Sequence, residues 1–213
     1  MRSIRNQLLQ VEIAFILRAL DATDAESPAV LNLLTDCETV DAILDQQSIL
    51  DAVLNDCATL RLPSRLYFYL ITRHSLKSSG LDDPELSDYV SGILDANLHQ
   101  QTRSKHIFYV VDWLEALQES SPARRYSLYV NAGDTLLYLT GLHRTHLAHR
   151  TRRRGAPSIG FYEDVAREAY RSALTHPLGE TDDHQSSYQK LADDFSLVRS
   201  ALNDAVERLM HFD

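Results

Sequence analysis

The sequence has little of what small disulfide-bonded or turn-rich domains depend on. Only two cysteines, seven glycines and six prolines occur among its 213 residues. The cysteines lack Cys-x-x-Cys spacing, and a chain of this length does not need a disulfide framework, so a reducing compartment is favoured. Scarce glycine and proline favour long helices over a turn-rich β architecture. We therefore expect a cytoplasmic protein built from helices.

Long apolar runs are also missing. No segment approaches the ~20 apolar residues that a bilayer-spanning helix needs. The N-terminus has basic residues followed by apolar ones, as a signal peptide does. However, Gln10, Glu12 and Arg18 interrupt the apolar run, and no small-residue cleavage site follows. The sequence predicts no membrane partner.

No segment alternates apolar and polar residues convincingly between turn signals. Apolar residues instead recur at helical spacing in successive windows. These windows are 4–21, 28–35, 38–45, 48–59, 63–76, 84–98, 107–117, 122–140, 159–174 and 186–211. The prediction is an all-α, single-domain bundle of about nine to eleven helices with a long C-terminal helix and essentially no β structure. One domain covers 1–213, with a possible subdivision into 1–60, the short-helix part, and 61–213, the main bundle.

Two helices of this set are expected to pack closely. Gly133 lies inside the predicted helix 122–140, where glycine costs about 1 kcal/mol relative to alanine, which suggests a packing reason. The predicted helix 159–174 carries small alanines on its apolar side. We expect close approach of these two helices at Gly133.

The last predicted helix, 186–211, has apolar residues at alternating spacings of three and four. They are Tyr188, Leu191, Phe195, Val198, Leu202, Ala205 and Leu209. Such a pattern is typical both of a homodimeric coiled coil and of a long helix packed in its own bundle. Dimerisation through 186–211 is therefore possible, although packing within the bundle is commoner.

Positive charge is concentrated in one segment. The chain has a net charge of -9, yet residues 122–171 contain nine arginines against four acidic residues, a balance of +5, which leaves -14 for the remainder. Because neutralising phosphates needs a basic surface, this distribution argues against a nucleic-acid partner. An acidic shell around a basic segment is expected.

The densest basic run lies in the predicted connector after helix 122–140. It consists of Arg150, Arg152, Arg153 and Arg154, and it precedes Ser158, a predicted N-cap. Guanidinium groups beside the free N–H groups of a helix start suit a phosphate or a carboxylate. Two interpretations stay open: the arginines bind an anionic partner, or they form internal salt bridges with nearby acids, namely Asp134, Glu163 and Asp164.

Polar side chains also line one side of the predicted helix 122–140. Together with residues further along the chain they define a possible pocket between helices 122–140 and 159–174. Its members are Asn131, Asp134, Tyr138, His146, Tyr162 and Glu163. No Gly-x-Ser-x-Gly context, paired-acid motif or dinucleotide glycine pattern occurs, so no catalytic residue is assigned. An enzyme using this pocket is the alternative hypothesis.

Three histidines, His143, His146 and His149, are spaced three apart and spread over an arc of about 120° on a helix. No carboxylate completes a ligand set, and the neighbouring Arg144 and Arg150 repel a cation, so no metal and no cofactor are expected. The sequence thus predicts a non-catalytic module that binds a protein or a small anionic ligand through the arginine-rich connector.

Overall fold

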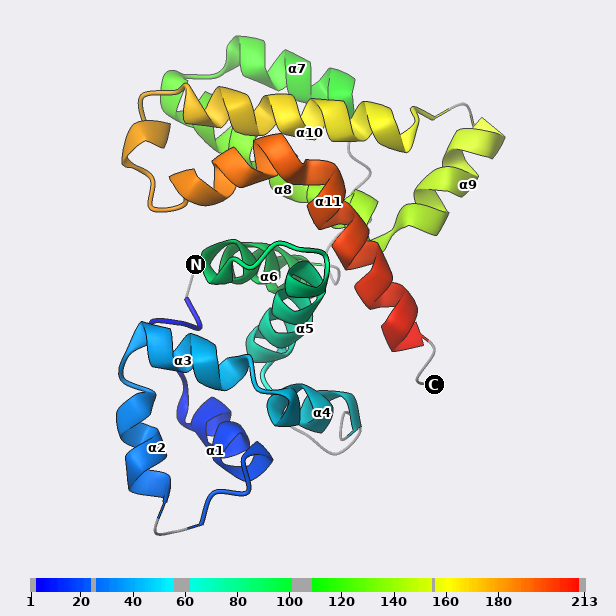
Figure 1. Cartoon of the computed structure of the whole chain (residues 1–213). Coiled ribbons are helices and arrows are strands. Elements are labelled where there is room, and N and C mark those ends of the chain that lie inside the picture. The colour runs from blue at the N-terminus through cyan, green and yellow to red at the C-terminus, as the bar shows by residue number, and fades with distance from the viewer. Residues whose placement is uncertain (1–2, 24–25, 56–61, 101–108, 155, 211–213) are drawn as a thin grey trace. The chain divides into compact units, whose positions relative to one another are not determined.

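The computed structural model describes residues 3–23, 26–55, 62–100, 109–154 and 156–210, apart from the side chains of residues 55, 99, 100, 119, 154 and 208–210. Within these ranges the chain forms eleven α-helices, one 3-10 turn and no strand (Figure 1). The all-α prediction is confirmed. The helices are α1 (Gln10–Ala19), α2 (Ser27–Leu33), α3 (Cys37–Leu44), α4 (Gln47–Asn55), α5 (Ser64–Ser78), α6 (Pro84–Gln100), α7 (Val110–Glu119), α8 (Pro122–Leu142), α9 (Arg144–Arg154), α10 (Ile159–Leu174) and α11 (Gln185–Met210), with the turn η1 at Gly179–Thr181.

The chain divides into two compact units. Unit 1 comprises Met1–Asp95, and unit 2 comprises Ala96–Asp213. The prediction of one domain over 1–213, with a subdivision after residue 60, stays a prediction.

The N-terminal segment departs from the prediction of a helix over 4–21, because α1 begins only after Leu9. The Glu12 carboxylate accepts the N–H of Leu9 at 2.7 Å and so closes the helix start. Upstream, Ile4 is fully buried and its N–H donates to Asp88 of α6 at 3.1 Å. This contact joins residues 84 positions apart, so tertiary packing overrides the local helical periodicity.

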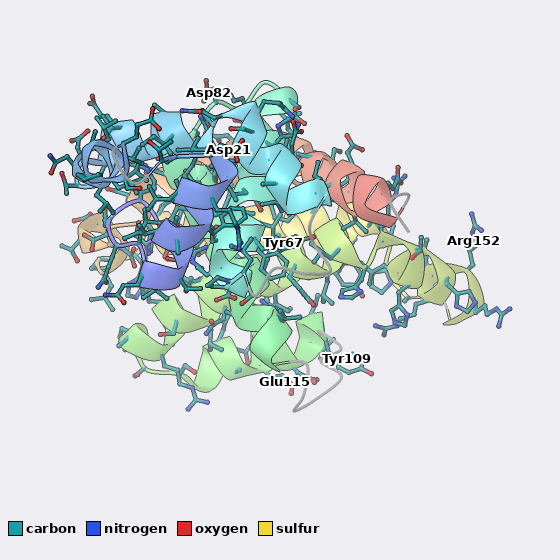
Figure 2. The ribbon with its side chains drawn as sticks, turned by 90° about the horizontal axis from the view of Figure 1, so that it is seen from below. Asp21, Tyr67, Asp82, Tyr109, Glu115 and Arg152 are labelled. Atoms are coloured by element: carbon teal, nitrogen blue, oxygen red, sulfur yellow. The ribbon has the colours of Figure 1, made fainter. Side chains whose placement is uncertain are left out.

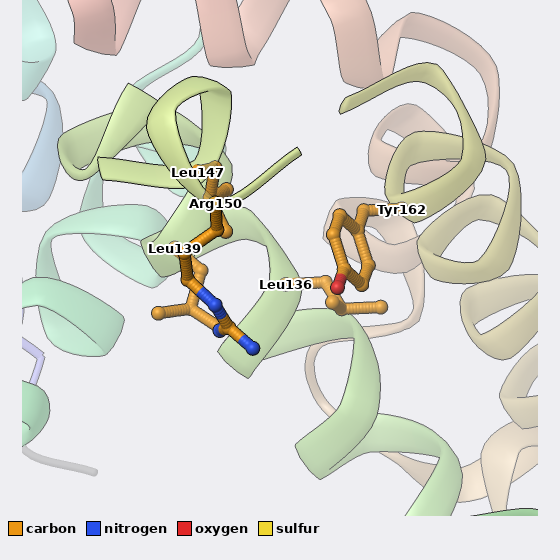
Figure 3. Close-up of a pocket in the computed structure, with 5 residues that line it drawn as sticks. All are labelled: Leu136, Leu139, Leu147, Arg150 and Tyr162. Atoms are coloured by element: carbon orange, nitrogen blue, oxygen red, sulfur yellow. The ribbon is translucent and has the colours of Figure 1, made fainter. Parts of the chain in front are cut away.

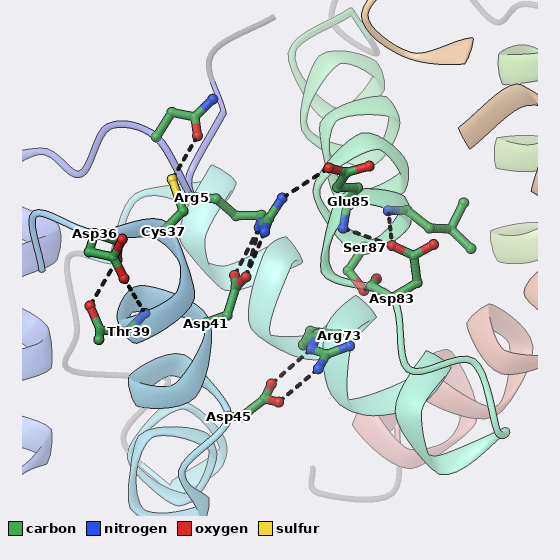
Figure 4. Close-up of polar contacts among 12 residues, drawn as sticks. Arg5, Asp36, Cys37, Thr39, Asp41, Asp45, Arg73, Asp83, Glu85 and Ser87 are labelled. Carbon is green, nitrogen blue, oxygen red and sulfur yellow. Dashed lines mark hydrogen bonds and ion pairs between the residues drawn. The ribbon is translucent and has the colours of Figure 1, made fainter. Parts of the chain in front are cut away.

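Arginine–aspartate pairs connect the elements of unit 1 (Figure 4). Arg5 donates to both carboxylate oxygens of Asp41 on α3, at 2.7 to 3.0 Å. Arg73 of α5 donates to Asp45, the residue that follows α3, at 2.7 and 2.8 Å. Burial by itself raises the pKa of Asp45, but its contacts with Arg73 and Lys77 lower that pKa below the ordinary value. Charge-assisted hydrogen bonds thus fix α3 to both the N-terminal segment and α5.

A third pair joins α5 to α6. Arg65 is only 7% exposed, and its Nη2 donates to the Asp88 carboxylate at 2.6 Å and to the Asp88 carbonyl at 2.8 Å. Its Nη1 donates to the hydroxyl of Ser91. Because Asp88 also accepts from Ile4, one carboxylate holds α5, α6 and the N-terminal segment together.

In unit 2, α8, α10 and α11 pack side by side (Figure 1). A β-carbon on Gly133 of α8 would lie 2.6 to 2.8 Å from ring atoms of Tyr170 on α10. Tyr170 is fully buried, and its hydroxyl donates to Asp134 at 2.9 Å. Burial, together with the neighbouring charge of Asp134, raises the pKa of Tyr170 well above its ordinary value. The expected close approach of these helices at Gly133 is confirmed.

The apolar seam of α11 is used inside the chain. Leu202 lies against Gly141 of α8, where a β-carbon would meet its Cδ1 at 2.9 Å. The side chain of Leu209 lies outside the described residues, and the other six predicted seam residues are all buried: Tyr188, Leu191, Phe195, Val198, Leu202 and Ala205. The bundle interpretation accounts for these six, and homodimerisation through 186–211 stays a prediction.

Ser158 occupies the N-cap position that the sequence predicts. Its hydroxyl accepts the N–H of Phe161 at 3.2 Å, and α10 follows from Ile159. Replacing Ser158 with alanine leaves that N–H without its partner, so we expect a loss of about 1 kcal/mol in the free energy of unfolding. Denaturant unfolding of the Ser158→Ala and Ser158→Asp variants measures the effect. Aspartate preserves the cap and should preserve stability, and equal losses in both variants would contradict a capping role.

Candidate functional site

The segment predicted as a basic connector is itself a helix, α9, and this part of the prediction is wrong. Arginine is a good helix former, and neither glycine nor proline occurs between Leu142, the last residue of α8, and Gly155. Leu147, only 4% exposed, anchors α9 in unit 2, where the helix contacts α8 and α10. The helix therefore sets the directions of its arginine side chains.

One side of α9 is exposed along its whole length. At about 100° per residue, five residues fall within an arc of about 120° opposite the buried Leu147. They are Thr145, His146, His149, Arg152 and Arg153, and all five are exposed. We call this set the outward face of α9. Figure 2 shows the Arg152 side chain pointing away from the ribbon.

No described residue neutralises Arg150, Arg152 or Arg153, the three arginines in the second half of α9 whose side chains are described. Among the described residues, Arg150, Arg152 and Arg153 take part in no ion pair or hydrogen bond through their guanidinium groups. The side chain of Arg154 lies outside the described residues. The sequence α9 spans contains no acidic residue that could screen them. Their positive charge is thus available to a partner.

The acids predicted as internal partners are engaged elsewhere or exposed. Asp134 accepts the hydrogen bond of Tyr170 at 2.9 Å. Glu163 lies 2.5 Å from Nε of Arg199 on α11, although the N–H is not directed at the carboxylate oxygen, so the contact is an ion pair rather than a hydrogen bond. Asp164 is exposed. In the described part of the chain, the internal salt bridges considered for Arg150, Arg152 and Arg153 are not formed.

The position of Arg152 and Arg153 has a structural reason of its own. They lie in the last turn of α9, where unpaired carbonyl groups make the helix end partially negative. A cation there stabilises a helix by about 0.3–1 kcal/mol. This interaction leaves most guanidinium N–H groups in water, so it does not prevent them from binding an anion.

Arg150 differs from its neighbours because it faces the interior of unit 2. It lines a pocket between α8, α9 and α10 together with Leu136, Leu139, Leu147 and Tyr162 (Figure 3). Its Nε is buried and has no hydrogen-bond partner among the described residues. The structure therefore brings two predicted site residues, Arg150 and Tyr162, into one pocket and separates them from the outward face of α9.

The other residues of the predicted polar pocket do not line this one. Asn131 and His146 are exposed. Tyr138 is buried, with its ring centroid 5.2 Å from that of His143. The carboxylates of Asp134 and Glu163 are held by Tyr170 and Arg199, on different elements. The convergence that the enzyme hypothesis requires is absent from the described residues.

Sequence reasoning missed a polar bridge between α10 and α11. The hydroxyl of Ser196 donates to Glu163 at 2.7 Å and accepts from Arg167 at 2.6 Å. Arg199 completes the bridge from the same side of α11. The only sequence signal was that Ser196 and Arg199 flank the apolar seam, which is where helices place polar residues that reach a neighbouring helix.

The histidines of this region do not form a metal site. Burial and the neighbouring His146 both lower the pKa of His143, which favours a neutral ring at pH 7. Across the described ranges, no three histidine, cysteine or acidic side chains are grouped as metal ligands. No helix in those ranges is both long and apolar enough to cross a membrane.

Comparison with known proteins adds nothing to this geometry. No protein family, curated protein or solved structure matches the chain. On one side of α9, Arg152 and Arg153 are exposed. On the other side, the guanidinium of Arg150 lies in a pocket lined by leucines. The guanidinium groups of both features suit negatively charged ligands.

Proposed function

We propose that this protein is a cytoplasmic, non-catalytic binding module that holds an acidic segment of a partner protein on the outward face of α9. The observation that carries the proposal is the pair of exposed guanidinium groups of Arg152 and Arg153, which have no acidic partner among the described residues. Guanidinium groups bind carboxylates in a bidentate geometry, which makes them suited to an acidic peptide.

An acidic protein is a better partner for this face than a nucleic acid. Nucleic-acid affinity depends on the number of phosphates that a protein neutralises, and a net charge of -9 opposes a long polyanion. A short acidic segment needs only the few cations that α9 supplies. In the described part of the chain, Asp134, Tyr138 and Glu163 do not line one pocket, so no observation supports the alternative hypothesis of an enzyme.

Reversing the charge of the outward face should abolish this binding. We expect the Arg152→Glu/Arg153→Glu variant to bind a fluorescein-labelled octaglutamate peptide at least about tenfold more weakly than the unaltered chain, because attraction becomes repulsion at two points. Fluorescence anisotropy at low salt measures the affinity. Raising the ionic strength to about 0.5 M should weaken binding of the unaltered chain, since the screening length then falls well below 10 Å.

A matched control separates a local site from a general charge effect. Arg124 and Arg125 at the start of α8 are both exposed, and their double replacement by glutamate changes the net charge equally. That control should retain octaglutamate binding. Equal loss in both double variants would contradict a site on α9, and tighter binding of a single-stranded oligonucleotide than of octaglutamate would favour the nucleic-acid hypothesis instead.

A further inference from the structure

Negative charge is concentrated in one part of unit 1 as strongly as positive charge is in α9. Between Arg18 and Arg61 the sequence contains nine aspartate and glutamate residues and no lysine, arginine or histidine. The helix α9 has the opposite composition, with five arginines, two histidines and no acidic residue. Every copy of this chain therefore carries two segments of opposite charge.

The acidic segment is exposed before and after α2. Glu26 accepts the N–H and the hydroxyl of Thr23 at 3.0 and 2.7 Å. Asp36 accepts the N–H of Thr39 at 3.1 Å (Figure 4). These donors are neutral, so both carboxylates keep their charge. In the described ranges, four exposed carboxylates near α2 form no ion pair: Asp21, Glu26, Asp36 and Glu38.

The helix between these carboxylates is apolar, and unit 1 leaves it uncovered. No residue of α2 is buried, and Leu31 and Leu33 are 42% and 48% exposed. An arginine can cover such leucines with its methylene stem while its guanidinium reaches a carboxylate. We call the six exposed residues the α2 surface: Asp21, Glu26, Leu31, Leu33, Asp36 and Glu38.

The α2 surface and the outward face of α9 also agree in length. Residues 26–34 span about 12 Å along α2, and residues 145–153 span about 12 Å along α9. The two helices can therefore lie alongside each other over their whole exposed length. Charge, apolar area and length thus make the α2 surface complementary to the outward face of α9.

We propose that the acidic partner of α9 is the α2 surface of a second copy of this chain. The guanidinium groups of Arg152 and Arg153 bind carboxylates of that surface, and their stems lie on Leu31 and Leu33. This inference rests on the function proposed above, because it names the acidic partner of the same outward face.

The interface is heterologous, because the two surfaces differ. Copies therefore add head to tail, and they form either closed rings or open chains. A pair of helices this short buries less than the roughly 1,200 Å² of stable interfaces, so the association is weak. We expect a dissociation constant of about 100 μM at low salt.

Sedimentation of the full-length protein tests the proposal, over concentrations that span this dissociation constant. The weight-average mass should rise above that of the monomer as the concentration increases. About 0.5 M salt should return it to the monomer, because the screening length then falls well below 10 Å. Octaglutamate should also dissociate the assemblies, since it occupies the outward face of α9. A monomeric mass at every concentration would overturn the inference.

Two charge variants locate the interface. Arg152→Glu/Arg153→Glu alters the outward face of α9, and Glu26→Gln/Asp36→Asn/Glu38→Lys alters the α2 surface. Glutamine and asparagine keep hydrogen-bond acceptors at positions 26 and 36, so the helix starts are preserved. Each variant by itself should remain monomeric at concentrations where the unaltered chain associates.

Mixing the two variants gives the sharpest result. The first variant keeps an intact α2 surface and the second keeps an intact α9, so the mixture should form a 1:1 complex although neither variant self-associates. An interface built from one identical surface on each copy, such as a pairing of 186–211, would not be restored by mixing. A mixture that stays monomeric would therefore contradict the assignment.

Matched controls alter charge elsewhere. Arg124→Glu/Arg125→Glu on α8 and Asp204→Lys/Glu207→Lys on α11 change exposed residues by the same amounts of charge as the two test variants. Both controls should associate as the unaltered chain does. If Arg152→Glu/Arg153→Glu does not fold, the α2-surface variant and the salt dependence of the unaltered chain still decide the matter.

The inference and the proposed function fail separately. The α2-surface variant should lose self-association yet keep octaglutamate binding, whereas Arg152→Glu/Arg153→Glu should lose both. Octaglutamate binding by a chain that stays monomeric would leave the proposed function in place and assign the acidic partner to another protein. Failure of the unaltered chain to bind octaglutamate would count against the proposed function itself.

Discussion

Replacing Asp88 with alanine should destabilise unit 1 by about 3–5 kcal/mol, because it leaves the buried cation of Arg65 without its carboxylate. The Arg65 side chain is 8% exposed and that of Asp88 13% exposed, so water replaces the lost partner poorly. The same substitution also removes the acceptor of the Ile4 N–H. Most domains have total stabilities of only about 5–15 kcal/mol, so the loss should be large enough to unfold part of the chain.

Denaturant unfolding followed by far-UV circular dichroism measures this loss, and amide hydrogen exchange in α5 and α6 locates it. Glu85→Ala on α6 is the matched control, because Glu85 is 63% exposed and lies 3.7 Å from Arg5. An exposed pair of this kind contributes about 0–1 kcal/mol. Asp88→Asn keeps an acceptor without the charge and should be intermediate. Equal effects of Asp88→Ala and Glu85→Ala would contradict the buried pair.

The second large effect concerns Tyr170. Tyr170→Ala should destabilise unit 2 by about 3–5 kcal/mol, since it removes a fully buried aromatic ring from between α8 and α11. Asp134 loses the phenolic donor at the same time. Fluorescence of Trp113 reports on this unit, because Trp113 is the only tryptophan and its indole N–H donates to the carbonyl of Leu128 at 3.1 Å.

The contact between Gly133 and Tyr170 predicts the sign of the stability change that Gly133→Ala causes. In the unaltered chain, Gly133→Ala should destabilise unit 2, because overpacking costs about 1–3 kcal/mol and exceeds the roughly 1 kcal/mol gained in helix propensity. In the Tyr170→Ala background, the same substitution should stabilise, because the added methyl enters vacated space. A double-mutant cycle measures this coupling. Stabilisation by Gly133→Ala in both backgrounds would contradict the contact.

Local patterns were enough to locate most helices. The predicted helix 159–174 matches α10, and the long C-terminal helix matches α11 within one residue at each end. Serine before a helical window identified the starts of α8 and α10, and proline at the first position supported that of α8, since capping is decided within about one turn. The start of α1 was wrong because Ile4 and Arg5 are held by side chains of α6 and α3.

The sequence located the basic segment but not the arrangement of its side chains. The count of arginines against acids identified the basic region that contains α9. The helical form of α9 was missed because its composition lacks the apolar stripe that identifies an amphipathic helix, and among its described side chains only Leu147 is buried. The helical backbone of α9 sets the direction of each side chain. Arg150 therefore points into the pocket of unit 2, and Arg152 points into solvent.

The sequence by itself determined the all-α class, most helix bounds, the Gly133 contact and the concentration of positive charge around α9. These features depend on residues within a few turns of each other or on composition. Only the tertiary structure decided which side chain meets which acid. Asp134 pairs with Tyr170 and Glu163 with Arg199, and each partner lies 36 residues away along the chain. The physical reason is that the packing of helices brings these polar groups together, while their spacing in the sequence does not.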